Sequence, residues 1–317
     1  MDSDAKDSHH RWRETLLVRC AGLPPKATAV VHPCDALSIS AASEAARLGL
    51  IEPLLVGPRI RIETAAAEAG VDITSFRLEE AAHSHAAAER AVELVRSGAA
   101  ALLMKGALHT DELMHAVMAD KMGLRTERRI SHVYIMEPPD WNRPLLITDA
   151  AINIQPTLED KRNIVQNAID LAIAMGIAPP KVALLSAVEF VNPGIPSTID
   201  AAALCKMADR GQILGGVLDG PLAFDNAIDE AAAREKRIAS PVAGRADILV
   251  APDLVAANIL AKMLTFVVHA DAAGVVLGAR CPIILTSRAD AERTRIASCA
   301  VAVLMADRPP LGVKPQA

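Results

Sequence analysis

Short apolar runs alternate along the chain with longer stretches whose apolar residues recur at helical spacing. The short runs are typical of buried strands, and the longer stretches are typical of amphipathic helices. Because parallel strands need a crossover connection that is usually a helix, this alternation predicts an α/β protein with mostly parallel sheets. The predicted strands lie at 27–33, 52–58, 100–104, 144–147, 181–185, 213–218, 247–250 and 282–285.

The predicted helices occupy the segments between these strands. One of them ends near Gly70, and another begins at Thr157 with Asp160 three positions on, which is an N-cap arrangement. No repeat and no low-complexity segment interrupts the pattern. The remaining predicted helices lie at 36–49, 85–98, 197–211 and 253–264, and the one that starts at Thr157 extends to residue 175.

Residues 121–145 differ from the rest of the chain. This segment is first charged and then rich in proline, and it contains the chain's only tyrosine and one of its two tryptophans. Composition shifts and proline clusters of this kind mark connections rather than regular elements. The sequence therefore predicts two α/β domains, with the chain crossing between them near Pro138–Pro144.

Small polar or charged residues follow nearly every predicted strand. Open α/β sheets bind their ligands at the carboxyl ends of the strands. This repetition therefore favours a polar cleft over a series of unrelated helix caps. The segments in question read KGALHT, TDAAIN, SAVEFVNPG, DGPLAFDNAID, APDLVAAN and TSRAD.

Lys105 and Gly106 precede Thr110 at a predicted strand-to-helix turn. A glycine lets a ligand approach the backbone, a helix start offers free N–H groups, and lysine adds positive charge, so the three suit an anion such as phosphate. The alternative is an ordinary turn glycine beside a solvated lysine. The chain has no GxxxxGK[ST] or GxGxxG motif, and nothing therefore indicates a nucleotide-binding loop of either type.

Two further polar pairs have i, i+4 spacing. Asp149 and Asn153 follow a predicted strand, where they could bind substrate or simply form a cap and an Asx turn. Asn258 and Lys262 lie in a predicted helix that is otherwise apolar. This setting favours a position facing a cleft over ordinary surface polarity.

A metal site and a hydrolase triad are not indicated. Asp225 and Asp229 could share a helical face and hold Mg²⁺, but no third carboxylate stands nearby, and a solvated acidic face is the simpler interpretation. The histidines lack the spacing of metal ligands, and no serine lies in a GxSxG motif.

Composition excludes several classes of protein. The formal net charge is -5 and only 2% of residues are aromatic, which argues against a nucleic-acid surface. The five cysteines are scattered without a CxxC pair, which favours a reducing, cytoplasmic setting. The polar start is not typical of a signal peptide, so none is expected, and no apolar run reaches the roughly 18 residues of a membrane span.

Several segments together resemble one enzyme family. Among them are LMKGALHT, GLRTERRISHV, SAVEFVNPGIPSTIDAAAL, SPVAGRADILVAPDLVAANILAKML and VVLGARCPIILTSRAD. Their order and spacing, over about residues 27–305, are similar to those of the phosphate acetyl/butyryl transferases. The motif sequences are more similar to the butyryl branch than to the acetyl branch. The resemblance implies reversible acyl transfer between coenzyme A (CoA) and inorganic phosphate, with both as substrates and no further cofactor.

The resemblance also implies an architecture. The expected fold has two α/β domains with an interdomain cleft, like isocitrate and isopropylmalate dehydrogenases, and the enzyme is expected to be a homodimer or a higher homo-oligomer. The last segment of the chain is expected to return to the first domain. The predicted domains are therefore 1–141 plus 288–317, and 142–287.

The family likeness also suggests roles for the residues of the TSRAD segment. Arg288 is expected to hold phosphate, because a guanidinium binds it bidentately, and Ser287 to donate to the transition state. Arg280, earlier in the segment VVLGARCPIILTSRAD, is assigned to substrate binding. The acetyl branch has an aspartate as its proposed base seven residues after this serine, where this chain has Thr294; it also has an arginine near Met114 and His115. Asp290 and Asp149 are the remaining candidates for the base.

Two other functions stay open from the sequence. One is a metal-dependent dehydrogenase of the same fold that uses Asp225 and Asp229, and the other is a catalytically weak protein that binds acyl phosphate or CoA. A butyryl-like acyl group is favoured for the transferase.

Overall fold

The computed structural model describes residues 11–139, 141, 143–286, 290–308 and 311. Two compact units are formed, an N-terminal unit of residues 13–130 and 273–308 and a middle unit built on residues 131–272. The exact domain limits remain a prediction: 1–141 plus 288–317 for the first domain and 142–287 for the second. Within the described chain, no helix combines the length and apolar composition needed to cross a bilayer.

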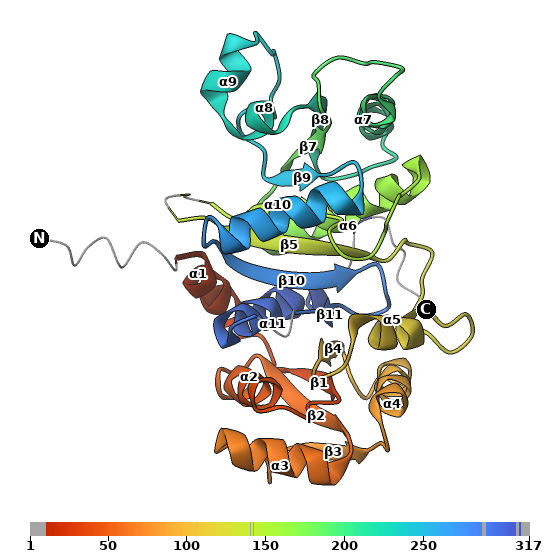
Figure 1. Cartoon of the computed structure of the whole chain (residues 1–317), viewed down its shortest axis with the longest axis vertical. Helices are drawn as coiled ribbons and strands as arrows, with labels where there is room; N and C mark the ends of the chain where they lie inside the picture. The colour runs from red at the N-terminus through yellow and green to blue at the C-terminus, as the bar shows by residue number, and fades with distance from the viewer. Residues whose placement is uncertain (1–10, 140, 142, 287–289, 309–310, 312–317) are drawn as a thin grey trace, which may run out of the picture. The chain divides into compact units, whose positions relative to one another are not determined.

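The N-terminal unit is a sheet with the strand order β3-β2-β1-β4-β11-β10. All neighbouring strands are parallel except β10, which runs antiparallel to β11. Helices α2, α3 and α11 pack together on one face, and α4 and α5 pack together on the other (Figure 1). The elements are α1 (Arg11–Cys20), β1 (Lys26–Val31), α2 (Ala36–Arg47), β2 (Ile51–Gly57), α3 (Arg59–Ala69), β3 (Arg77–Glu80), α4 (Ser84–Arg96), β4 (Leu102–Lys105), α5 (Thr110–Met118), β10 (Asp271–Leu277), β11 (Ile283–Ile284) and α11 (Glu292–Ala306).

The middle unit is a sheet with the strand order β5-β6-β9-β7-β8. β5 runs antiparallel to β6, and the other neighbours are parallel. Helix α6 packs against β5, β6 and β9, and α10 packs against β5 and β6. The elements are β5 (Ser131–Glu137), β6 (Leu145–Thr148), α6 (Leu158–Ala174), β7 (Lys181–Leu185), α7 (Pro196–Asp209), β8 (Val217–Leu222), α8 (Phe224–Ile228), α9 (Glu230–Glu235), β9 (Ile248–Val250) and α10 (Leu254–Phe266).

Local sequence signals explain where many helices begin. Asp35 accepts a hydrogen bond from the Ser38 N–H at 2.7 Å, and this fixes the start of α2. Thr157 and Asp160 form the predicted capping box of α6. Asp253 caps α10 through the Ala256 N–H at 2.9 Å. Each side chain satisfies an N–H that has no partner inside the first turn of the helix.

The predicted α/β class with mostly parallel strands is confirmed. The strand predicted at 213–218 is displaced: the observed strand, β8, spans Val217–Leu222. Gly215 and Gly216 precede it and pack against Ile169. Strands β3, β5 and β10 were not predicted. β3 is a charged edge strand, and β5 begins with the buried polar residues Ser131 and His132, so neither has the apolar run typical of a core strand.

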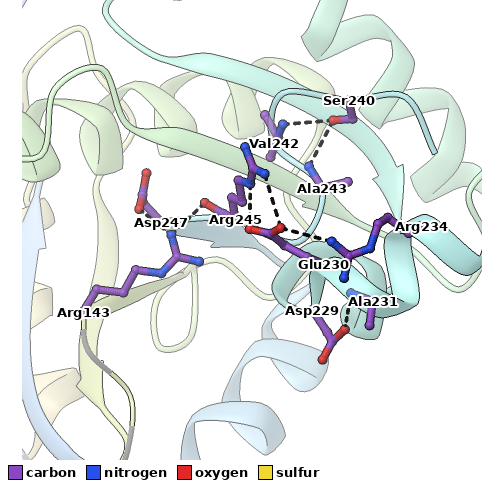
Figure 2. Close-up of polar contacts among 10 residues, drawn as sticks. All are labelled: Arg143, Asp229, Glu230, Ala231, Arg234, Ser240, Val242, Ala243, Arg245 and Asp247. Carbon is purple, nitrogen blue, oxygen red and sulfur yellow. Dashed lines mark hydrogen bonds and ion pairs between the residues drawn. The ribbon is translucent and has the colours of Figure 1, made fainter. Parts of the chain in front are cut away.

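The amino ends of the parallel strands in the middle unit carry an ion-pair network (Figure 2). Arg143 donates to the Asp247 carboxylate at 3.3 Å, just before β6 and β9, and Arg245 pairs with Glu230 of α9 at 2.7 Å. Gly244 has a φ of 76°, and a Cβ there would lie 2.6 Å from the Cα of Glu230. Only glycine fits this turn, which holds α9 against the end of the sheet.

Candidate active site

Three adjacent strands of the N-terminal unit end side by side. Val31 of β1 pairs with Lys105 of β4, and Met104 of β4 pairs with Ile284 of β11. Because the three strands are parallel, the residues that follow them meet at one edge of the sheet. This edge, called the carboxyl edge below, is where the sequence predicted a ligand site.

Gly106 lies at the centre of this carboxyl edge. Its N–H donates to the Val31 carbonyl at 3.0 Å, and a Cβ at this position would lie 2.5 Å from the same oxygen and 2.8 Å from the His32 carbonyl oxygen. Contacts this short between a Cβ and backbone oxygen force one of the two chains to move. The glycine is therefore required by the close approach of β4 to β1 and not by a positive φ.

Lys105 is buried at the end of β4, with its Nζ 3.5 Å from the Gly106 carbonyl oxygen. The turn from Lys105 into α5 is as predicted, and Thr110 is the first residue of that helix. Glu112 accepts a hydrogen bond from the His109 N–H at 2.7 Å, so a carboxylate already serves one donor of this helix start. A buried ammonium next to a glycine turn remains a suitable partner for an oxyanion.

Two other buried polar side chains lie at the same edge and were not singled out from the sequence. The Thr286 hydroxyl, which follows β11, has no hydrogen-bond partner among the described residues. Neither ring nitrogen of His32 makes a hydrogen bond of good geometry within the described chain. Burial, and then the charge of Arg61, lower the pKa of His32, whereas contacts with Ala107, Glu112 and Asp35 act in the opposite direction.

Ser287 and Arg288, the predicted catalytic pair, lie outside the described residues. Asp290 is half-buried just before Ala291, which is the N-cap of α11. Helix α11 therefore begins at Glu292, two residues after Asp290.

Arg295 is buried in the first turns of α11, and no motif of the sequence singled it out. Burial lowers the pKa of its guanidinium, while Asp35 and Asp290 act to raise it. Asp290 and Arg295 are thus electrostatic neighbours beside the TSRAD segment. Thr294, which occupies the position of the acetyl-branch base, is half-buried on the same helix.

Arg280 is not brought to the carboxyl edge. It is exposed in the connection from β10 to β11, and its N–H donates to the Leu124 carbonyl at 2.9 Å. It therefore lies before β11, at the opposite end of that strand from Thr286.

The middle unit has its own group of predicted residues, centred on Asp149 after β6. The buried Asp149 carboxylate accepts the backbone N–H groups of Ala151, Ile152 and Asn153 at 3.0–3.1 Å, and the Asn153 amide at 2.5 Å. Burial raises the pKa of Asp149, and these hydrogen bonds lower it. The Asx-turn interpretation of Asp149 is correct, and its oxygens already have four donors.

Helix α10 joins this group through Asn258. The Asn258 side chain donates to the Ala150 carbonyl at 3.1 Å, and the Leu254 N–H donates to the Ile154 carbonyl at 3.2 Å. Lys262, one turn on, is exposed. Asp149, Asn153 and Asn258 therefore form one cluster, with a cation one helical turn from it.

The carboxylates of the metal hypothesis have other partners. Asp229 caps α9 by accepting the N–H groups of Ala231 and Ala232 at 2.6 and 2.8 Å, and Asp225 lies 3.8 Å from the Lys236 ammonium. Over the described ranges, no group of three His, Cys, Asp or Glu side chains could hold a metal ion.

Known proteins match most of the chain. The family model described as phosphate acetyl/butaryl transferase matches residues 83–303. A phosphate acetyltransferase of Rhizobium meliloti is 62% identical over 93% of both chains. A phosphate butyryltransferase of Clostridium acetobutylicum is 41% identical over 92% of this chain and 97% of its own.

Solved structures show the same fold. A branched-chain phosphotransacylase from Enterococcus faecalis superposes with a TM-score of 0.76 at 30% identity, covering 88% of this chain and 99% of its own. A 4-hydroxythreonine-4-phosphate dehydrogenase from Klebsiella pneumoniae, at a TM-score of 0.52 and 14% identity, shares the fold alone over 89% of this chain and 99% of its own. The predicted likeness to dehydrogenases thus holds at the level of the fold. By its sequence relatives over nearly its whole length, the chain belongs to the phosphate acetyl/butyryl transferase family.

Proposed function

We propose that this protein is a phosphate acyltransferase that moves a short-chain acyl group reversibly between CoA and inorganic phosphate. The observation that carries the proposal is the 62% identity, over 93% of both chains, to a protein named phosphate acetyltransferase. A buried lysine and a buried threonine hydroxyl at the ends of parallel strands support it, because both can donate to an oxyanion.

The chemistry needs no cofactor beyond the two substrates. A phosphate oxygen attacks the thioester carbonyl carbon, a C–O bond forms, the C–S bond breaks, and CoA leaves as a thiolate that takes up a proton. In the reverse direction the thiolate attacks the carbonyl carbon of acyl phosphate. Negative charge builds up on the carbonyl oxygen in both directions, so fixed donors and cations lower the barrier.

We assign the anion to the carboxyl edge of the N-terminal unit. Lys105 supplies charge beside the Gly106 turn, Thr110 begins the adjoining helix, and Ser287 and Arg288 follow the Thr286 hydroxyl directly in sequence. In this assignment Arg288 holds the phosphoryl oxygens bidentately and Ser287 donates to the developing oxyanion. The strand register supports it, because β4 and β11 are adjacent and parallel.

Of the two candidates for the base that deprotonates CoA, we favour Asp290. The Asp149 carboxylate is already occupied by four N–H donors, which suits it to holding the 149–153 turn in place. Asp290 is half-buried, follows Ser287 and Arg288 closely in sequence, and is an electrostatic neighbour of Arg295. Asn153, Asn258 and Lys262 of the middle unit, and Arg280, remain proposed contacts to substrate.

The acyl group is the finer part of the proposal. The sequences of the motifs favoured a butyryl-like group. Over most of its length, however, this chain is 62% identical to the protein named phosphate acetyltransferase and only 41% identical to the one named phosphate butyryltransferase. We therefore propose acetyl-CoA as the better substrate. Comparing kcat/KM for acetyl-, propionyl- and butyryl-CoA would decide, and a clear preference for butyryl-CoA would reverse this choice.

The test of the function is phosphate-dependent release of CoA from an acyl-CoA, measured with a thiol reagent. The wild-type protein should release CoA only when phosphate is present, and Arg288→Ala should lower kcat/KM by about 100-fold or more. Arg288→Lys keeps the charge without the bidentate geometry and should fall between the two. Absence of phosphate-dependent release with every short acyl chain would reject the proposal.

Neither remaining alternative is favoured. The dehydrogenase hypothesis rests on 14% identity and a shared fold. Reduction of NAD by the protein, or inhibition of its activity by a chelator, would support that hypothesis. CoA binding without turnover would support a binding protein. We also propose, from the family resemblance, that the protein works in the cytoplasm as a homodimer or a higher homo-oligomer.

A further inference from the structure

His32, the residue that follows β1, has a left-handed backbone, with a φ of 52°, and is only 4% exposed. Such a backbone is uncommon outside glycine, and it concentrates at functional sites, where the surrounding structure holds it in place. The His32 N–H donates to the Val56 carbonyl of β2 at 2.7 Å. Its own carbonyl accepts the N–H groups of Cys34 and Ala107 at 2.8 and 2.9 Å. Contacts with β2 and with the turn after β4 therefore fix this conformation.

The imidazole ring of His32 lies against the end of β2 and the turn at Gly106. A Cβ on Gly57, the last residue of β2, would lie 3.7 Å from the ring Cδ2, and the Ala107 backbone is a polar neighbour of the ring. Neither ring nitrogen makes a hydrogen bond of good geometry to the described part of the chain. Buried polar groups of this kind are rare, because burial removes the hydrogen bonds that water supplies. A bound molecule that pairs with the ring would restore them.

The ring belongs to the same edge as the residues assigned to the anion. Lys105 ends β4, which is paired with β1 on one side and with β11 on the other. His32 follows β1 and Thr286 follows β11, so these two residues flank the Gly106 turn. Lys105 is 4% exposed, like His32, so burial does not set the ring apart from the group that already has the anion as its proposed partner. An oxyanion beside Gly106 is therefore next to polar groups of all three strands.

The protonation state of the ring suits a hydrogen-bond donor. Burial is the largest cause of the lowered pKa of His32, and the charge of Arg61 is the next, whereas the Ala107 contact, Glu112 and Asp35 act to raise the pKa. The ring is therefore uncharged at neutral pH, with one N–H donor and one acceptor nitrogen. Such a ring can hold an oxyanion by hydrogen bonding while a lysine ammonium supplies the positive charge.

We propose that His32 is a further substrate contact of the carboxyl edge, and that its imidazole donates a ring N–H to an oxygen of the phosphoryl group, in inorganic phosphate or in acyl phosphate. Lys105 neutralises the same group. The inference rests on the proposed acyltransferase function, and it names a residue that neither the sequence motifs nor the family likeness pointed to. Because the contact is made to the phosphoryl group and not to acyl-CoA, His32 should govern the affinity for phosphate.

The first experiment follows the histidine rings of the full chain by ¹⁵N NMR while inorganic phosphate is added, with calorimetry to show when the protein is saturated. His32→Asn identifies the His32 signals among those of the nine histidines. Phosphate should shift the His32 ring signals saturably and leave those of His269, in the middle unit, unchanged. His32 signals that do not move on saturation would overturn the proposal, because a ring paired only with buried water does not respond to phosphate.

The second experiment uses the kinetics of phosphate-dependent CoA release. His32→Asn exchanges the ring for a shorter amide and keeps a residue that tolerates a left-handed backbone. It should raise KM for phosphate about tenfold, the effect of one lost hydrogen bond to a charged group, and change KM for acyl-CoA less than twofold. His269→Asn is the matched control, since His269 is also left-handed, with a φ of 58°, but exposed, and both KM values should stay unchanged. Circular dichroism and thermal unfolding confirm that both variants are folded.

The two experiments separate this proposal from the proposed function. Phosphate-dependent CoA release by wild type, with an unchanged KM for phosphate or an equal rise of both KM values in His32→Asn, would reject the contact and keep the function. Ring signals that shift with phosphate in a protein that releases no CoA would support the contact and reject the acyltransferase function.

Discussion

Replacing Gly106 with alanine should separate the geometry of the carboxyl edge from general stability. The added methyl group would lie 2.5 Å from the Val31 carbonyl oxygen and 2.8 Å from that of His32. Both atoms belong to the backbone, so no side-chain rotation relieves the contact. The end of β4 would have to move away from β1, carrying Lys105 with it.

The expected cost follows from these contacts. Overpacking of this kind costs about 1–3 kcal/mol, and weakening the Gly106 N–H to Val31 hydrogen bond adds roughly 1 kcal/mol. Gly106→Ala should therefore lower the free energy of unfolding by about 2–4 kcal/mol. In a unit of this size that corresponds to a fall in Tm on the order of 5–15 °C. A displaced Lys105 should lower kcat/KM by about tenfold or more even in the folded fraction.

The assay combines urea unfolding, followed by circular dichroism, with phosphate-dependent CoA release at a temperature where each variant is folded. Gly244→Ala is the matched control, because its Cβ would lie 2.6 Å from the Cα of Glu230 at the amino end of the middle unit's sheet, the end opposite Asp149. Gly211→Ala adds a second control, since Gly211 has a φ of 71° with no atom within 4 Å, and it should cost only about 1 kcal/mol.

Two results would refute this reasoning. If Gly106→Ala were as stable and as active as wild type, the close approach of β4 to β1 would not constrain the edge. If Gly244→Ala lost as much kcat/KM per folded molecule as Gly106→Ala, the loss of activity would follow from destabilisation alone.

Further predictions concern single side chains. Asn258→Ala should lower the free energy of unfolding by about 1–2 kcal/mol in urea, because the buried Ala150 carbonyl loses its donor; an unchanged value would mean that the bond contributes nothing. Since the pKa of His32 is lowered on folding, the unfolded chain binds this proton first, so stability should fall as pH drops below about 6.5, and His32→Gln should flatten that slope between pH 5 and 7.5. Burial raises the pKa of Cys20 to about 11 and those of Cys205, Cys281 and Cys299 to about 12, so a thiol reagent at pH 8 should label the folded protein slowly and far from completely, whereas rapid labelling of all five thiols would contradict the burial.

The sheet strands that could be predicted are those with continuous apolar runs. β1, β4 and β9 are buried along most of their length, and apart from Thr28 and Lys105 their buried positions hold only Val, Ile, Leu, Ala or Met. β5 was not predicted because it begins with Ser131 and His132, polar residues that are typical of loops. In the fold, the Ser131 hydroxyl accepts a hydrogen bond from the Asn167 amide at 2.9 Å, and the His132 carbonyl accepts one from the Thr148 hydroxyl at 2.8 Å. Such partners are distant in sequence and leave no local signal.

The candidate site was predictable to the same degree. Lys105, Gly106 and Asp149 follow recognisable strands, and their place at strand ends is confirmed. Arg295 was missed because burial of an arginine depends on tertiary packing around α11. Arg280 was included through the family resemblance, and its role in substrate binding stays a prediction.

The middle unit divides its sheet between two tasks, and this division has a use in engineering. The loop after β6 carries the polar cluster of Asp149, while Arg143, Asp247, Arg245 and Glu230 lie at the amino ends of the strands (Figure 2). A library that aims to change the proposed substrate contacts can randomise positions around the first group while keeping the second group and Gly244 constant. Most members of such a library should remain folded, so a screen would report changes in chemistry instead of losses of solubility.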